Sequence, residues 1–182
     1  MTQRTARPPA TAGVAGAPSP DDPRLRAWIA FLQAYAVVTR RLEAELQAER
    51  GLSLAEYDAL VQLAIADDRR LRMSELANRV VLSRSGVSRL VDRLAADGLV
   101  ARRACPTDAR GSWAELTPDG LDRLRDAAPV HLRGVDAHFL SSIAAEDHEG
   151  LVRGLEAVVR GMQSPDESVP PACSAIAEAL EP

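Results

Sequence analysis

The chain has 182 residues, of which 46% are hydrophobic and only 3% aromatic, and its formal net charge is −4. This length accommodates one domain with appended arms, and burial by Leu, Ala and Val favours packed helices over strands. Two cysteines exclude a disulfide framework, and the longest apolar stretch, residues 28–38, is too short to span a membrane. With no signal peptide in the sequence, we expect a cytoplasmic protein without membrane contacts.

The first part of the chain divides into an arm and a helix. Residues 1–21 are rich in Pro, Ala, Gly and Thr and lack apolar periodicity, which predicts a disordered N-terminal arm. Asp22 and Pro23 form a typical helix start, and apolar residues then recur at helical spacing up to Gly51, which predicts a helix over 22–50. Ser53 then opens a second helix, with Glu56 completing a capping box.

The middle of the chain predicts a helix-turn-helix followed by a hairpin. A short helix from Ser74, which we expect to be its N-cap, to Val80 is separated by a tight turn from a second helix over 84–96. Two short extended runs, residues 99–103 and 112–116, flank turn residues 106–111 and predict a β-hairpin.

The last part of the chain predicts two more helices and a tail. A long helix begins at Thr117-Pro118, and a last helix runs from about Glu146 to Val159 with Leu151, Leu155 and Val158 turned inward. The cap of that last helix is weak because Ala144 and Ala145 precede Glu146. Residues 163–182 are interrupted by Pro and predict a flexible C-terminal tail.

Positive charge is concentrated in the middle of the chain. All basic residues are Arg, and ten of them lie between Arg69 and Arg110 beside only four acids, so this segment carries +6 and the remainder −10. Such an asymmetry is typical of a basic DNA-facing module on an acidic scaffold, although a solvated charged face would give the same numbers.

The second helix of the predicted pair carries groups that recognise nucleic acid. Its non-core face presents Ser and Arg side chains, which form hydrogen bonds with base edges and phosphates; the residues are Arg84, Ser85, Ser88, Arg89, Asp92 and Arg93. Arg110, at the tip of the hairpin, could reach a flanking minor groove.

The sequence resembles the MarR family of bacterial transcription regulators over about residues 52–159. The resemblance rests on MSELANRVVLSRSGVSRLVDRLAADGLVARR, on the Asp108-Ala109-Arg110 wing, and on Leu116-Thr117 with Gly120 at the family's spacing. It implies a mainly α fold: a winged helix-turn-helix with a two-stranded hairpin wing over 53–120, and dimerisation helices over 22–50 and 118–162. The whole MarR-type domain would then cover residues 22–162.

The resemblance also implies a function and roles for matched residues. A homodimer would bind a pseudo-palindromic operator in double-stranded DNA, usually as a repressor. Ser85, Ser88 and Arg89 would lie in the major groove, and Arg84 and Arg93 would lie nearer the phosphates. Arg110 would enter the minor groove, with Asp108 holding it by an ion pair. Asp108 and Arg110 could instead form a purely structural turn pair, and Arg93 could instead pair with Asp97.

Regulators of this kind respond to a signal, and the sequence leaves its nature open. A small aromatic effector could lie among Trp28, Phe31, Tyr35 and Tyr57, although core or dimer packing is the more ordinary role for these rings. Thiol-redox sensing would use Cys105, which adjoins two Arg residues, and zinc sensing would draw on His131, His138 and His148. We expect neither a metal site nor a cofactor, because no ligand-spacing motif occurs.

Two other functional classes can be weighed against a regulator. Catalysis fits poorly, because no nucleophile–base pair, phosphate-binding Gly loop or paired-carboxylate site emerges, and we expect no enzyme. A winged helix used only as a protein-interaction module would share the fold but would not bind DNA, so salt-dependent DNA binding discriminates between the two.

Overall fold

The structure is a computed structural model that describes residues 18–19, 21–80, 82–105 and 108–162. The predicted tail at 163–182 lies outside the described residues, as does nearly all of the predicted arm at 1–21, so both stay predictions. The chain divides into two units, residues 1–37 and 38–182, and each is described by itself.

The first unit contains the beginning of helix α1 (Leu25–Arg50). The helix begins three residues after Asp22, whose carboxylate accepts a hydrogen bond of 2.9 Å from the backbone N–H of Arg24. Large apolar side chains along this part of α1 are exposed: Trp28, Ile29, Phe31, Leu32, Tyr35 and Val37. Within the first unit, this apolar surface is therefore uncovered.

The second unit begins with the rest of α1, in which Leu42 and Leu46 are buried. Gly51 ends the helix as predicted, with a φ of +59° that favours glycine. Helix α2 (Leu54–Ala64) follows, and its predicted capping box is confirmed. Ser53 Oγ accepts from the Glu56 backbone N–H at 3.2 Å, and Glu56 Oε2 accepts from the Ser53 backbone N–H at 3.0 Å.

The helix-turn-helix consists of α3 (Met73–Arg79) and α4 (Arg84–Ala96), as the sequence predicts. Ser83 caps α4, with its Oγ 3.1 Å from the Gly86 backbone nitrogen. The expectation that Ser74 caps α3 is wrong. Arg72 occupies the cap position without a side-chain hydrogen bond, because the chain enters α3 directly from a strand.

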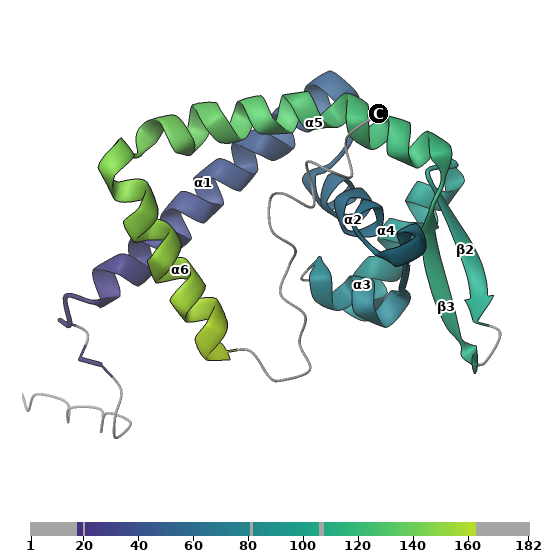
Figure 1. Ribbon diagram of the computed structural model, residues 1–182, viewed down its shortest axis with the longest axis horizontal. Coiled ribbons are helices and arrows are strands. Elements are labelled where there is room, and N and C mark those ends of the chain that lie inside the picture. Colours follow the sequence, from purple (N-terminus) through teal and green to yellow (C-terminus); the bar gives the residue numbers. More distant parts are fainter. Residues whose placement is uncertain (1–17, 20, 81, 106–107, 163–182) are drawn as a thin grey trace, which may run out of the picture. The chain divides into compact units, whose positions relative to one another are not determined.

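The sheet contains the predicted hairpin and one additional strand. Strands β2 (Val100–Cys105) and β3 (Asp108–Leu116) pair antiparallel, and β1 (Arg70–Arg72) pairs with the other edge of β3. Figure 1 shows the β2–β3 hairpin projecting past the helices it packs against. The sequence does not reveal β1, because a single buried residue, Leu71, is too short a pattern to show alternation.

Helix α5 (Pro118–His138) begins at Thr117, whose Oγ1 accepts from the Gly120 backbone N–H at 3.0 Å. The helix start lies directly against the residue that precedes β2: a Cβ at Gly120 would lie 2.0 Å from the Leu99 carbonyl oxygen. Only glycine permits this approach, which explains the glycine three residues after the threonine.

Two short 3-10 turns, η2 (Leu140–Ser142) and η3 (Ala145–Asp147), lead into helix α6 (His148–Met162). The expectation that Leu151, Leu155 and Val158 face inward is wrong for the single chain, where they are 36%, 38% and 60% exposed. The spacing predicts the apolar stripe correctly, but no element among the described residues buries it.

The core of the second unit lies where α2, α3, α4 and α5 meet the sheet. Leu residues dominate it, and seven of them are less than 2% exposed: Leu46, Leu60, Leu63, Leu76, Leu90, Leu94 and Leu124. The core fixes α4 from one side and leaves its other side to solvent.

Candidate nucleic-acid interface

Helix α4 has one face in the core and one face in solvent. Val87, Leu90, Val91 and Leu94 are at most 1% exposed, whereas Ser85, Arg89, Asp92 and Arg93 are exposed. The buried residues recur at helical spacing, so they determine which side chains point outward. The candidate site is this outward face together with the strands beside it.

The N-terminal turn of α4 carries two serines. Ser83 Oγ caps the helix and lies 3.2 Å from Ser85 Oγ, so both hydroxyl groups are held at the start of the outward face. The side chain of Arg84, a predicted phosphate contact, lies outside the described part of the chain.

Ser88 and Asp92 are joined to the sheet by Arg102. The Arg102 guanidinium donates from Nη2 to Ser88 Oγ at 3.0 Å, and its Nε lies 3.2 Å from Asp92 Oδ1. Sequence reasoning missed this contact, because Arg102 lies in the predicted extended run 99–103, far along the chain from Ser88. The spacing of Ser88 and Asp92 by one helical turn was the available signal.

Arg89 lies between these anchored groups and is exposed. No hydrogen bond or ion pair joins it to another residue of the described ranges. Its guanidinium therefore presents five N–H donors to solvent in a planar fork.

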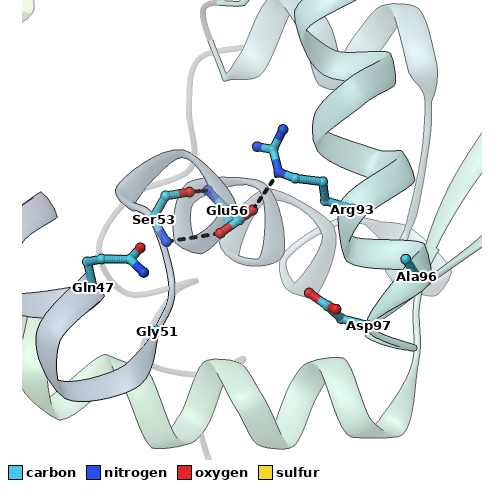
Figure 2. Close-up of a pocket in the computed structure, with 7 residues that line it drawn as sticks. All are labelled: Gln47, Gly51, Ser53, Glu56, Arg93, Ala96 and Asp97. Carbon is cyan, nitrogen blue, oxygen red and sulfur yellow. Dashed lines mark hydrogen bonds and ion pairs between the residues drawn. The ribbon is translucent and has the colours of Figure 1, made fainter.

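Arg93 is held by α2. Its Nε donates to Glu56 Oε1 at 3.0 Å, so the expected alternative pairing with Asp97 is wrong (Figure 2). Partial burial alone would raise the pKa of Glu56, but hydrogen bonds from the Ser53 backbone and from Arg93 hold it below its usual value. Glu56 meets Arg93 because the start of α2 lies beside the end of α4. The spacing of residues along one helix cannot predict such a contact between two helices.

A polar cleft adjoins this ion pair. It has a volume of about 460 Å³ and opens to solvent among Gln47, Gly51, Ser53, Glu56, Arg93, Ala96 and Asp97 (Figure 2). Asp97 lines the cleft without an ion pair to another described residue.

The outer face of the sheet is basic and carries an aromatic ring. The guanidinium carbons of Arg70 and Arg72 lie 5.3 and 5.2 Å from the centroid of the Trp113 ring, within cation–π distance. Arg103 lies opposite Trp113 in the register and pairs with Glu115 at 3.2 Å. Sequence reasoning missed this face, because β1 is too short for its alternation to be recognised.

The hairpin residues singled out in the sequence, Asp108 and Arg110, belong to β3. Their side chains lie outside the described part of the chain, as does that of Cys105. Both the ion pair and the turn-pair alternative therefore stay predictions.

The four predicted effector residues lie in two places. Trp28, Phe31 and Tyr35 follow one another along α1 in the first unit, with ring centroids 6.0 and 6.4 Å apart. Tyr57 belongs to the second unit, is 3% exposed and stacks on His131 at 4.4 Å. Burial raises the pKa of Tyr57 to about 12 and lowers that of His131. Tyr57 therefore serves core packing, and a role for the other three rings stays a prediction.

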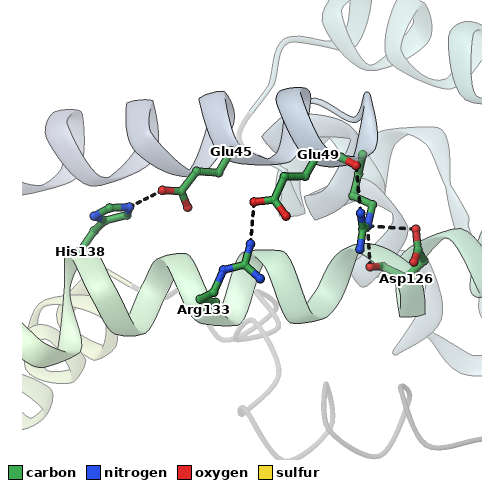
Figure 3. A network of polar contacts seen from close by, with 6 residues as sticks. Glu45, Glu49, Asp126, Arg133 and His138 are labelled. Atoms are coloured by element: carbon green, nitrogen blue, oxygen red, sulfur yellow. Dashed lines mark hydrogen bonds and ion pairs between the residues drawn. The ribbon is translucent and has the colours of Figure 1, made fainter.

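Polar pairs join α1 to α5 in the second unit. His138 Nε2 lies 2.6 Å from Glu45 Oε1, and Arg133 Nη2 lies 2.6 Å from Glu49 Oε1. Figure 3 shows both pairs bridging the two helices. In the described ranges, no three His, Cys, Asp or Glu side chains are close enough to hold a metal ion. The described helices include none with the length and apolarity needed to cross a membrane.

Comparison with known proteins places this geometry in a family. The MarR family model matches residues 50–111. The structure resembles that of Sco3205, a MarR family transcriptional regulator from Streptomyces coelicolor in complex with DNA, with a TM-score of 0.73 and 31% identity over 85% of this chain and 97% of that one. It also resembles AbsC, a MarR family transcriptional regulator of the same organism, with a TM-score of 0.71 and 34% identity over 80% of this chain and 98% of that one.

A curated relative is more similar in sequence over a shorter range. The HTH-type transcriptional repressor YetL of Bacillus subtilis is 39% identical over 108 residues, which are 59% of this chain and 64% of that protein. The match thus spans less than two thirds of that relative. Since the chain resembles Sco3205 and AbsC at more than 30% identity over nearly their whole lengths, it belongs to the MarR family of transcriptional regulators.

Proposed function

We propose that the chain binds specific sequences in duplex DNA as a homodimer and represses transcription from the sites it occupies. The observation that carries this proposal is the two-faced helix α4, with Val87 and Leu94 at most 1% exposed and Arg89 in solvent. A helix anchored in this way can enter the major groove, which admits one helix and displays a distinct pattern at each base pair. The DNA in the Sco3205 structure supports this proposal.

The side chains divide by what they can recognise. Ser85, Ser88 and Arg89 would contact base edges, because they lie on the outward face within the first two turns of α4. Arg84 and Arg93 would contact phosphates; Arg93 donates only its Nε to Glu56 and keeps its Nη groups for a phosphate.

The hairpin would supply the flanking contact. Arg110 would enter the minor groove beside the site and Asp108 would orient it, since Arg is attracted by the concentrated negative potential of a narrow minor groove.

A homodimer would cover apolar surface that the described residues of one chain leave exposed. Helix α6 exposes one apolar stripe, formed by Leu151, Val152, Leu155, Val158, Val159 and Met162. In the first unit, the apolar side chains of α1 are exposed as well. Such a contiguous stripe on a helix marks a protein–protein contact. A two-fold dimer would place its two α4 helices about 34 Å apart, one DNA turn, and would select a pseudo-palindromic operator.

Repression and its release complete the proposal. YetL is named a repressor, which supports the same role here. A small aromatic effector that stacks on Trp28, Phe31 or Tyr35 would release the operator if it binds the DNA-incompetent form of the protein more tightly than the DNA-binding form. An effector with equal affinity for the two forms would not shift the equilibrium between them.

A selection experiment tests the proposal. The purified chain is incubated with a random duplex library, bound DNA is sequenced, and affinity for the enriched site is measured between 50 and 200 mM salt, the range over which several phosphate contacts cost roughly 10³-fold or more in affinity. We expect a pseudo-palindrome and a steep salt dependence. A chain that binds no duplex would instead be a protein-interaction module, and a chain that binds duplex but enriches no sequence would not read bases; either result would contradict the proposal.

A further inference from the structure

The contact between Arg102 and Ser88 limits what the serine hydroxyl can do. Arg102 Nη2 donates to Ser88 Oγ at 3.0 Å, and a guanidinium has donors but no acceptor. Ser88 Oγ must therefore accept this bond with a lone pair, and its single hydrogen is directed elsewhere. In the described ranges, no residue accepts that hydrogen.

Asp92 keeps Arg102 in this position. The carboxylate lies one helical turn beyond Ser88 and 3.2 Å from Arg102 Nε, so a single planar guanidinium spans both residues on α4. Two anchors restrict the rotation of the guanidinium more than one would. The pair also neutralises a carboxylate that would otherwise repel phosphates from this face.

We propose that Arg102 is a positioning residue that makes Ser88 a hydrogen-bond donor toward DNA and so sets base preference at the position that Ser88 reads. This inference rests on the proposed function. In the major groove, guanine offers two acceptors and thymine one, whereas cytosine offers only an amino donor. A serine restricted to donation favours a base acceptor and disfavours an amino group. Without Arg102 the hydroxyl rotates freely and accepts from amino groups as well.

The adjacent charge strengthens this bias. A hydroxyl that accepts from a cation is polarised, and its own hydrogen becomes a better donor because hydrogen bonds in a chain reinforce one another. The expected effect is the net worth of one hydrogen bond, about a three- to tenfold change in discrimination at one base pair.

The chain offers a matched control on the same strand. Arg103 follows Arg102 in β2, points to the opposite face of the sheet and pairs with Glu115 at 3.2 Å. Arg102→Met and Arg103→Met therefore remove the same charge from adjacent positions, but only the first frees Ser88. Both residues are exposed, and circular dichroism checks that the variants fold. The second variant is Arg102→Thr, because threonine favours strands but is too short to reach Ser88.

The test measures base preference at each position of the site that the wild-type chain selects from a random duplex library. Ser88→Ala first identifies the base pair that Ser88 reads. We expect Arg102→Met to reduce discrimination at that base pair about three- to tenfold. The double variant with Ser88→Ala should discriminate no less than Ser88→Ala alone. Arg102→Lys should retain part of the discrimination that Arg102→Met loses. Arg103→Met should leave that position unchanged.

Two results would overturn the inference. If Arg102→Met keeps the wild-type preference at that base pair, even where it weakens binding to all sequences, Arg102 does not act through Ser88. The proposed function would then still stand. If the wild-type chain enriches no sequence, the proposed function is wrong and this inference fails with it.

Discussion

Arg93 of α4 donates to Glu56 of α2, with 3.0 Å between Nε and Oε1, while the other oxygen of the same carboxylate accepts from the Ser53 backbone N–H at 3.0 Å. One side chain thus completes the capping box of α2 and fixes the last turn of α4. The position of the proposed recognition helix therefore depends on a residue outside the helix-turn-helix.

Replacing Glu56 with Ala should lower the free energy of unfolding by about 1 to 2 kcal/mol, since a helix cap and a partly exposed ion pair are lost together. Urea denaturation followed by circular dichroism measures this change. Asp97→Ala is the control, because Asp97 lines the same cleft without pairing with Arg93, and it should leave stability nearly unchanged. Equal losses in both variants would contradict the assigned pairing.

Gly120 is required by the close approach of α5 to the hairpin. A Cβ at this position would lie 2.0 Å from the Leu99 carbonyl oxygen and 2.8 Å from Leu116 Cδ1, so Gly120→Ala forces backbone to move. We expect a loss of roughly 3 kcal/mol or more, read as a fall in the thermal midpoint. Gly150→Ala in α6, whose nearest contact would be 3.9 Å away, should leave the midpoint unchanged or slightly raised. A harmless Gly120→Ala would show that the contact relaxes easily.

The sequence predicts those features of the fold that depend on local chemistry. Ser53 with Glu56, Ser83, Gly51 and Thr117 each mark a helix end, because capping uses residues within one turn of each other. The bounds of α4 follow in the same way. Strand β1 cannot be predicted from local chemistry, because it exists only through its pairing with β3.

The site is less predictable than the fold because its contacts are long-range. Helical spacing identifies the outward residues of α4, but not that Ser88 meets Arg102 or that Arg93 meets Glu56. Spacing alone suggested Asp97 for Arg93, since an i+4 acid is the nearest charge along the helix. The tertiary position of α2 decides otherwise.

His131 should make stability depend on pH. Burial lowers the pKa of His131 in the folded state, so the unfolded chain binds a proton more readily. The stability is therefore complete above the unfolded-state pKa of about 6.5 and is lost as the pH falls through the folded-state pKa. His131→Phe keeps the stack on Tyr57 and removes both the titration and a buried Nδ1 without a hydrogen-bond partner among the described residues. The unfolding free energy of this variant should therefore vary less over this pH range than that of the wild type. Identical profiles for wild type and His131→Phe would assign the pH dependence to other groups.

Leu155→Glu should dissociate the proposed homodimer, because it places a charge within the exposed apolar stripe of α6. Sedimentation equilibrium measures the dimer dissociation constant, which we expect to rise at least 100-fold. Ala157→Glu adds the same charge to the opposite face of the same helix and should leave the constant within about twofold. A wild-type chain that sediments as a monomer, or a Leu155→Glu variant that stays dimeric, would remove α6 from the interface.

Arg89→Ala separates base reading from general attraction to DNA. The exposed guanidinium can form two hydrogen bonds with one guanine, so its loss should weaken binding to the selected operator by about 1 to 3 kcal/mol and binding to random duplex far less. Fluorescence anisotropy at constant salt gives both affinities, with Arg160→Ala in α6 as the control that should change neither. If Arg89→Ala weakened both equally, Arg89 would contact phosphate, and sequence reading would then depend on the two serines and the hairpin.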